Sequence, residues 1–150
     1  MRAPTVLALP AVVIAFLAAA CDPAQELRNE ECKAYSEWSN HAGDLLAAAV
    51  PDSEKSVATT NAQEAAIYRR LAAAARTCAG AANPFKDPYV RDLAHQRLAV
   101  FDALAVALDH QADAWQKGDK AAIQRALDEE LAAQAKLPPL SDEWLHHCKR

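Results

Sequence analysis

The chain has 150 residues and a formal net charge of −4, which is enough for one domain and too short for two of ordinary size. Ala supplies 37 of the residues, Gly only 3, and aromatic residues 6%, so the composition favours helix over sheet. The longest basic clusters are Arg69-Arg70 and Lys149-Arg150, which argues against a nucleic-acid partner, because nucleic-acid binding needs a concentrated positive surface.

The N-terminal segment has the three-part order of a secretory signal. Arg2 gives a positive start, residues 6–17 (VLALPAVVIAFL) are apolar, and residues 18–20 are alanines that precede Cys21. The apolar run is shorter than the roughly 20 residues of a membrane-spanning helix, so a transmembrane anchor or a buried N-terminal helix is the weaker alternative. Residues 1–20 are therefore predicted to be a signal peptide.

The segment Leu17-Ala18-Ala19-Ala20-Cys21 resembles the lipobox of bacterial lipoproteins. In that family the cysteine becomes the first residue after cleavage and carries the lipid. The resemblance therefore implies lipidation of Cys21 by acyl chains such as palmitate, and several acyl chains together anchor a protein stably. The usual lipobox has Leu three places before the cysteine, where this chain has Ala18. The same alanines also fit an ordinary A-x-A cleavage site, which would leave Cys21 unlipidated and the protein secreted.

The resemblance also implies a location in the bacterial cell envelope. Residues 21–150 would form a lipid-anchored domain on the periplasmic side of a membrane. In enteric bacteria an Asp directly after the lipidated cysteine marks retention at the inner membrane, and Asp22 fits that rule. The rule varies among bacteria, so the choice between inner and outer membrane stays open.

The first helix of the mature domain is expected over about residues 24–50. Apolar residues recur along it at three- and four-residue steps, which is the pattern of one helical face, and Pro51 then ends it. The residues on this face are Leu27, Ala34, Trp38, Ala42, Leu45 and Ala49.

The second helix is expected to begin after Thr60 and to stop at Gly80. Thr60-Asn61-Ala62-Gln63 matches a capping box, which favours this start over one at Asp52 or Ser53 and leaves residues 51–59 mostly as loop. The face of this helix carries Glu64, Ile67, Leu71, Ala74 and Cys78.

The third helix has the clearest signal. Asp87 is suited to cap it, Pro88 suits the first helical position, and Gly118 ends it. Asp119 then caps a fourth helix, and so short a connection predicts that the third and fourth helices are antiparallel neighbours. The apolar seam of the third helix is formed by Ala94, Leu98, Phe101, Ala105, Leu108, Ala112 and Trp115.

The fourth helix is expected to carry Ile123, Leu127 and Leu131 and to stop at Pro138-Pro139. Ser141 would cap a short final helix. The predicted fold class is therefore all-α, an antiparallel four-helix bundle with a short C-terminal helix.

Four cysteines are present, at Cys21, Cys32, Cys78 and Cys148, and an envelope location permits disulfides. If Cys21 carries lipid, three remain and one of them is unpaired within the monomer. Without lipid, four cysteines allow two bonds, for which Cys32–Cys78 and Cys21–Cys148 are a natural pairing.

The placement of the second helix at Thr60 favours a Cys32–Cys78 disulfide. The turn between the first two helices is then centred near residue 55, which places Cys32 level with Cys78 in an antiparallel pair. A start at Ser53 would separate the two by ~12 Å at ~1.5 Å per residue, whereas a disulfide needs Cα atoms ~4.4–6.8 Å apart. Cys148 is then the third thiol. Bonds from Cys148 to either of the other two, and three reduced thiols, are the alternatives.

Candidate chemistry is sparse. His146-His147-Cys148 is the most suggestive cluster, because imidazole and thiolate suit zinc or copper. However, adjacent side chains on a helix point about 100° apart, and no C-x-x-C or H-x-x-x-H pair supports them. Nucleophile and glycine-rich phosphate motifs are absent from the sequence. No metal ligand, cofactor or catalytic residue is therefore assigned.

The favoured expectation is a non-catalytic cell-envelope lipoprotein. Its helical bundle would bind an unknown protein partner or support an envelope assembly. The alternatives are a periplasmic metal or small-ligand carrier that uses His and Cys residues, a secreted helical protein without lipid, and an enzyme. For the enzyme no arrangement of nucleophile, base and orienting group can be named.

Overall fold

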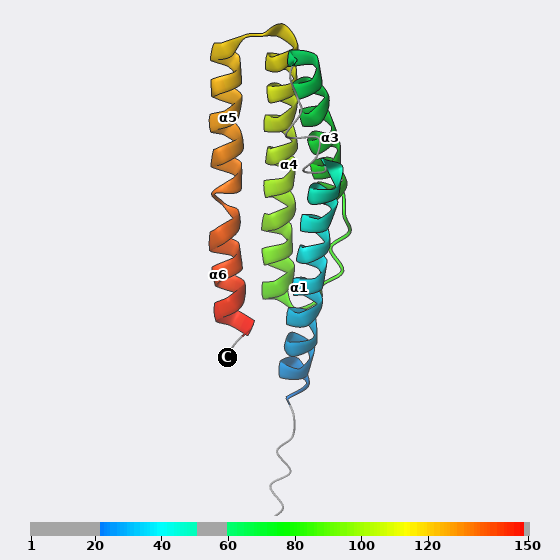
Figure 1. Cartoon of the computed structure of the whole chain (residues 1–150). Helices are drawn as coiled ribbons and strands as arrows, with labels where there is room; N and C mark the ends of the chain where they lie inside the picture. Colours follow the sequence, from blue (N-terminus) through cyan, green and yellow to red (C-terminus); the bar gives the residue numbers. More distant parts are fainter. Residues whose placement is uncertain (1–21, 51–59, 149–150) are drawn as a thin grey trace, which may run out of the picture.

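The computed structural model describes residues 22–50 and 60–148. Within these residues the chain forms five helices and no strand, which confirms the all-helical fold class (Figure 1). The predicted signal peptide, the lipidation at Cys21 and the loop over residues 51–59 lie outside the described residues. The helices are α1 (Pro23–Ala49), α3 (Asn61–Ala79), α4 (Pro88–Lys117), α5 (Lys120–Gln134) and α6 (Leu137–Cys148).

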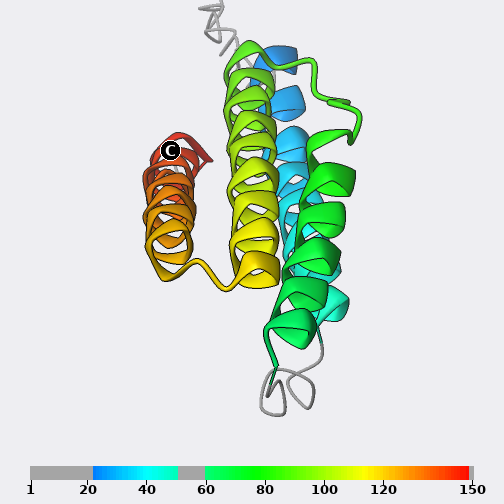
Figure 2. The same ribbon diagram turned by 90° about the horizontal axis from the view of Figure 1, so that it is seen from above.

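α4 is the central helix. In both views α5 and α6 lie on one side of it and α1 and α3 on the other (Figure 1, Figure 2). Buried side chains run along most of α4, from Val90 to Ala114, whereas α5 buries only Ala126 and Ala133. α1 and α6 pack against the N-terminal half of α4 and α3 packs along its C-terminal half.

Most helix ends follow the local signals in the sequence. Thr60 and Gln63 form the predicted capping box, with the Thr60 hydroxyl accepting from the Gln63 amide and the Gln63 side chain accepting from the Thr60 amide. Asp87 caps α4 and Asp119 caps α5. Gly118 ends α4 with φ of 66°, a left-handed conformation that glycine adopts at little cost.

The predicted boundary between the last two helices is wrong. α5 ends at Gln134, and α6 begins at Leu137, so that Pro138 and Pro139 occupy the first turn of α6. Proline is tolerated there because the first amides of a helix have no intrahelical acceptor. Ser141 lies inside α6 rather than capping it, and its hydroxyl donates to the Leu137 carbonyl at 3.3 Å.

The predicted apolar faces are only partly buried. In α1 the buried side chains are Cys32, Tyr35 and Ala42, whereas Leu27 and Ala34 are exposed. Leu27 is 37% exposed, and the first turns of α1 extend past the start of α4 (Figure 1). The predicted faces of α3 and α4 agree more closely with the buried side chains. Their buried members are Ile67, Cys78, Ala94, Phe101, Ala105, Leu108 and Ala112.

α5 buries small side chains and leaves its larger apolar side chains partly exposed. The small residues Ala126 and Ala133 contribute its buried surface. Ile123 and Leu127 are only half-buried, and Leu131 is 53% exposed. These larger apolar side chains therefore lie at the edge of the core.

Candidate functional site

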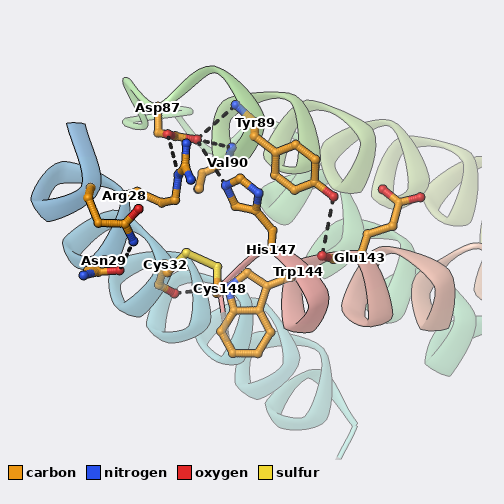
Figure 3. The surroundings of a disulfide bond; sticks show 11 residues. Arg28, Asn29, Cys32, Asp87, Tyr89, Val90, Glu143, Trp144, His147 and Cys148 are labelled. Carbon is orange, nitrogen blue, oxygen red and sulfur yellow. Dashed lines mark hydrogen bonds and ion pairs between the residues drawn. A yellow bond between two sulfur atoms is a disulfide. The ribbon is translucent and has the colours of Figure 1, made fainter. Parts of the chain in front are cut away.

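The disulfide of the structure joins Cys32 of α1 to Cys148 of α6, with Cα atoms 5.8 Å apart (Figure 3). The predicted Cys32–Cys78 bond is wrong, as is the assignment of Cys148 as the third thiol. The alternative Cys21–Cys148 bond is wrong for the same reason. Cys78 is the free cysteine among the described residues, and burial raises the pKa of its thiol, which keeps it protonated.

The error lies in the register of α1 against α3. The prediction placed the two helices level about a turn centred at residue 55. In the structure the Cys78 thiol lies 3.6 Å from the Ala42 carbonyl oxygen, to which it donates. Ala42 is ten positions after Cys32, which is about 15 Å along a helix. That distance is far beyond the reach of a disulfide.

Three segments that are distant in sequence meet at the Cys32–Cys148 bond: the N-terminal part of α1, the loop before α4, and the C-terminus of α6 (Figure 3). The indole N–H of Trp144 donates to the Cys32 carbonyl at 3.2 Å. The Glu31 carboxylate accepts from the backbone amides of Lys86 and Asp87 at 2.8 and 2.7 Å. The junction is therefore held by one covalent bond and several hydrogen bonds.

Asp87 is a buried carboxylate at this junction and is 6% exposed. Its Oδ1 accepts from the amides of Tyr89 and Val90, both at 3.0 Å. Arg28 Nε lies 3.7 Å from Oδ2, and His147 Nε2 lies 3.9 Å from Oδ1. The positive end of the α4 dipole stabilises a carboxylate in this position.

The residues of the predicted cluster His146-His147-Cys148 do not form a shared site. Cys148 is bonded to Cys32, so its sulfur is not available as a thiolate ligand. The His147 ring stacks on Tyr89, with centroids 3.8 Å apart and planes at 17°. No group of three or more potential metal-binding side chains occurs in the part of the chain that the structure describes.

Aromatic side chains pack in the same core cluster as the disulfide. The ring centroid of Tyr35 lies 5.7 Å from those of Trp38 and Phe85 and 6.3 Å from that of Trp144. Aromatic pairs at such distances stabilise a core beyond their buried area. Because Phe85 belongs to the loop before α4, this cluster fixes the loop as well as the helices.

Arg97 is a buried charged residue that the sequence did not single out. It is 8% exposed, and its guanidinium donates to the Tyr35 hydroxyl at 3.1 Å, to the Ser141 hydroxyl at 3.1 Å, and to Ser39. The partners come from α1 and α6, so one side chain of α4 joins three helices. No described carboxylate lies within ion-pair distance of Arg97. The only signal in the sequence was a basic residue three positions after Ala94, on the same side of the helix as the apolar seam.

A second candidate site is a groove of about 300 Å³ between α3 and α5. We call it the α3–α5 groove. Burial raises the pKa of Glu130, although the amide groups of Gln111 and Gln134 donate to its carboxylate. Burial also raises the pKa of Tyr68, and the charges of Glu130 and Glu64 add to that effect. The lining residues are Glu64, Ile67, Tyr68, Leu71 and Glu130.

The raised pKa of Glu130 predicts a pH dependence. The folded state holds its proton at higher pH than the unfolded chain, whose carboxyl titrates near 4.5. The folded state therefore binds more protons just above that pH, and the stability contributed by this group falls as pH rises through the folded pKa. We expect Glu130→Gln to flatten the fall in unfolding free energy above pH 4.5, measured by urea titration between pH 4 and 8. Glu37→Gln, at an exposed position of α1, is the matched control and should keep the wild-type profile.

Comparisons with protein-family models, with curated proteins and with solved structures found no match. None of the helices in residues 22–50 and 60–148 combines the length and apolar character needed to cross a bilayer. A functional assignment therefore rests on the residues and contacts of the chain itself.

Proposed function

We propose that the chain is a non-catalytic, lipid-anchored protein of the bacterial cell envelope, with a bundle that binds a protein partner. The observation that carries the proposal is the lipobox-like segment Leu17–Cys21, which ends directly before Asp22, the N-cap of α1. The helical domain would then follow the anchor without a linker.

The proposed architecture is an antiparallel four-helix bundle. The helices α3, α4 and α5 follow one another along the chain and lie side by side, with α4 in the middle (Figure 1). α6 continues in line with α5 after a short break between Gln134 and Leu137. Together α5 and α6 supply the fourth helix of the bundle, beside α1, α3 and α4.

The disulfide supports export from the cytoplasm. Stable disulfides form in oxidising compartments such as the bacterial periplasm. The Cys32–Cys148 bond also joins two cysteines of the mature domain, so neither of them would compete for Cys21. This is the pattern expected if Cys21 carries lipid instead.

The proposed anchor gives the bundle a membrane-proximal and a membrane-distal end. Asp22 to Cys32 spans about 15 Å of helix, and most of these residues are exposed. The disulfide junction would thus stand a short distance above the membrane. The α3–α5 groove would lie toward the other end, because α3 begins near Gly118 in the turn that joins α4 to α5. That end is the one open to a partner.

Metabolic labelling with a radioactive fatty acid tests the anchor. We expect label on the wild-type protein, none on Cys21→Ser, and unchanged label on the control Cys78→Ser. Label that persists on Cys21→Ser would overturn the lipid anchor. A processed, unlabelled wild-type protein would favour simple secretion instead.

A further inference from the structure

α5 presents an apolar stripe that the other described helices leave partly open. Ile123, Leu127 and Leu131 recur at four-residue steps and therefore lie along one side of the helix. The stripe covers about 12 Å, or two helical turns. Leu131, at its end, is 53% exposed, which is unusual for a large side chain on a regular apolar face.

The Ile123 and Leu127 end of the stripe lies on the side of α5 that carries Glu130, and Leu131 lies one step further toward solvent. Glu130 shares that side with Ile123 and Leu127 by its spacing, and it lines the α3–α5 groove together with residues of α3. The other side of α5 carries Glu129, whose carboxylate lies 2.6 Å from Nδ1 of His110 in α4. Stripe and groove are thus one continuous surface, which we call the extended groove. Its residues are Glu64, Ile67, Tyr68, Leu71, Ile123, Leu127, Glu130 and Leu131.

The extended groove carries negative charge without compensation. Within the described residues neither Glu64 nor Glu130 forms an ion pair, and Glu130 accepts hydrogen bonds only from the neutral side chains of Gln111 and Gln134. A partly desolvated carboxylate gains most from a cation that donates hydrogen bonds to it. The Tyr68 ring on the same wall adds an aromatic face that attracts cations.

We propose that the extended groove binds an amphipathic, basic helix of a partner protein. Leucine-like side chains of that helix would pack on the stripe of α5, and its Lys or Arg side chains would pair with Glu64 and Glu130. The charge selects a basic partner. The two-turn length of the stripe selects a helix, because a small cation would fill the cavity and leave Leu127 and Leu131 in water. The inference deepens the proposed function by naming the surface and the partner's chemistry, and it does not depend on the lipid anchor.

Fluorescence anisotropy with model peptides tests the groove on the mature, full-length protein. The probe is a labelled helix of Leu and Lys with one apolar face, and the control peptides are a Leu/Glu helix and a scrambled Leu/Lys sequence. We expect saturable binding of the first peptide only. Glu64→Gln/Glu130→Gln should weaken it about tenfold or more, as expected for two interfacial charge pairs.

Two exposed apolar positions give a matched pair of variants. Leu131→Glu, at a residue 53% exposed on the stripe, should abolish binding. Val106→Glu, at a residue 50% exposed on α4 and outside the extended groove, should leave it unchanged. Both residues are already about half-exposed, so both variants should fold, which circular dichroism would verify.

Several results would overturn the groove proposal. The scrambled peptide could bind as tightly as the Leu/Lys helix, or the Val106 and Leu131 variants could lose peptide affinity to the same extent. Spermine alone could displace the peptide completely. The wild-type protein could also form a dimer in sedimentation equilibrium that Leu131→Glu dissociates. The last result would assign the surface to a second copy of the chain. Fatty-acid labelling of Cys21 is independent of all of them, so the anchor and the groove can fail separately.

Discussion

Replacement of both bonded cysteines, Cys32→Ser with Cys148→Ser, is expected to lower the free energy of unfolding by about 4–5 kcal/mol. The bond joins positions 116 residues apart, so it closes a loop that contains nearly the whole described domain. In the chain-entropy account, a loop of this length restricts the unfolded chain strongly. Urea unfolding monitored by circular dichroism measures the difference.

Reduction supplies the control for this prediction. Wild-type protein in dithiothreitol should unfold like the double variant, and the double variant should not respond to the reductant. Cys78→Ala should remain sensitive to reduction, because Cys78 is outside the bond. If the Cys78 variant became insensitive to reduction, Cys78 would belong to the disulfide in place of Cys32 or Cys148.

Among the helices, α6 should lose the most local stability when the disulfide is removed. This helix buries only one side chain fully, Leu140, and its other contacts with the bundle are hydrogen bonds and ring contacts near its C-terminal half, such as those of Trp144 and His147. Without the covalent bond, hydrogen exchange of α6 amides should quicken more than that of α4 amides.

Arg97→Ala is the second substitution with a large expected effect, a loss of about 3 kcal/mol in unfolding free energy. It removes the donors of three hydrogen bonds to hydroxyls of Tyr35, Ser39 and Ser141. Hydrogen bonds to a charged group are worth about 1.5–3 kcal/mol each, and the half-satisfied hydroxyls left behind add a cost. The loss stays below the sum because burying the guanidinium is itself unfavourable.

Two variants define the origin of that loss. Arg91→Ala, an exposed arginine on the same helix, should change stability by less than about 0.5 kcal/mol. Tyr35→Phe removes one hydroxyl only and should cost about 1 kcal/mol. An Arg97→Ala variant as stable as Arg91→Ala would show that the three hydroxyls do not hold the helices together.

Local signals predicted helix ends well. Thr60, Asp87, Gly118 and Asp119 act within one turn of the residues they cap, so the information lies in adjacent sequence. Pro138 failed as a stop signal because the first turn of a helix accepts proline as readily as a loop does.

Contacts between residues distant in the chain were harder to predict from the sequence. The pairing of Cys32 depended on how far α1 slides along α3, and no residue near either cysteine encodes that register. Likewise, the spacing of Ile123, Leu127 and Leu131 correctly defines one side of α5 but does not say whether another helix covers it. Arg97 was overlooked because its three hydroxyl partners lie 44 to 62 residues away in the chain.

The Cys32–Cys148 bond also sets how the protein would carry tension. If a partner pulled on α5 against an anchor at Cys21, the shortest covalent route would run from α5 through α6, across the disulfide, and along the eleven residues back to Cys21. α3, α4 and most of α1 lie outside that route. The central core would bear little of the load, and the tether would keep its mechanical continuity even while α3 and α4 unfolded and refolded.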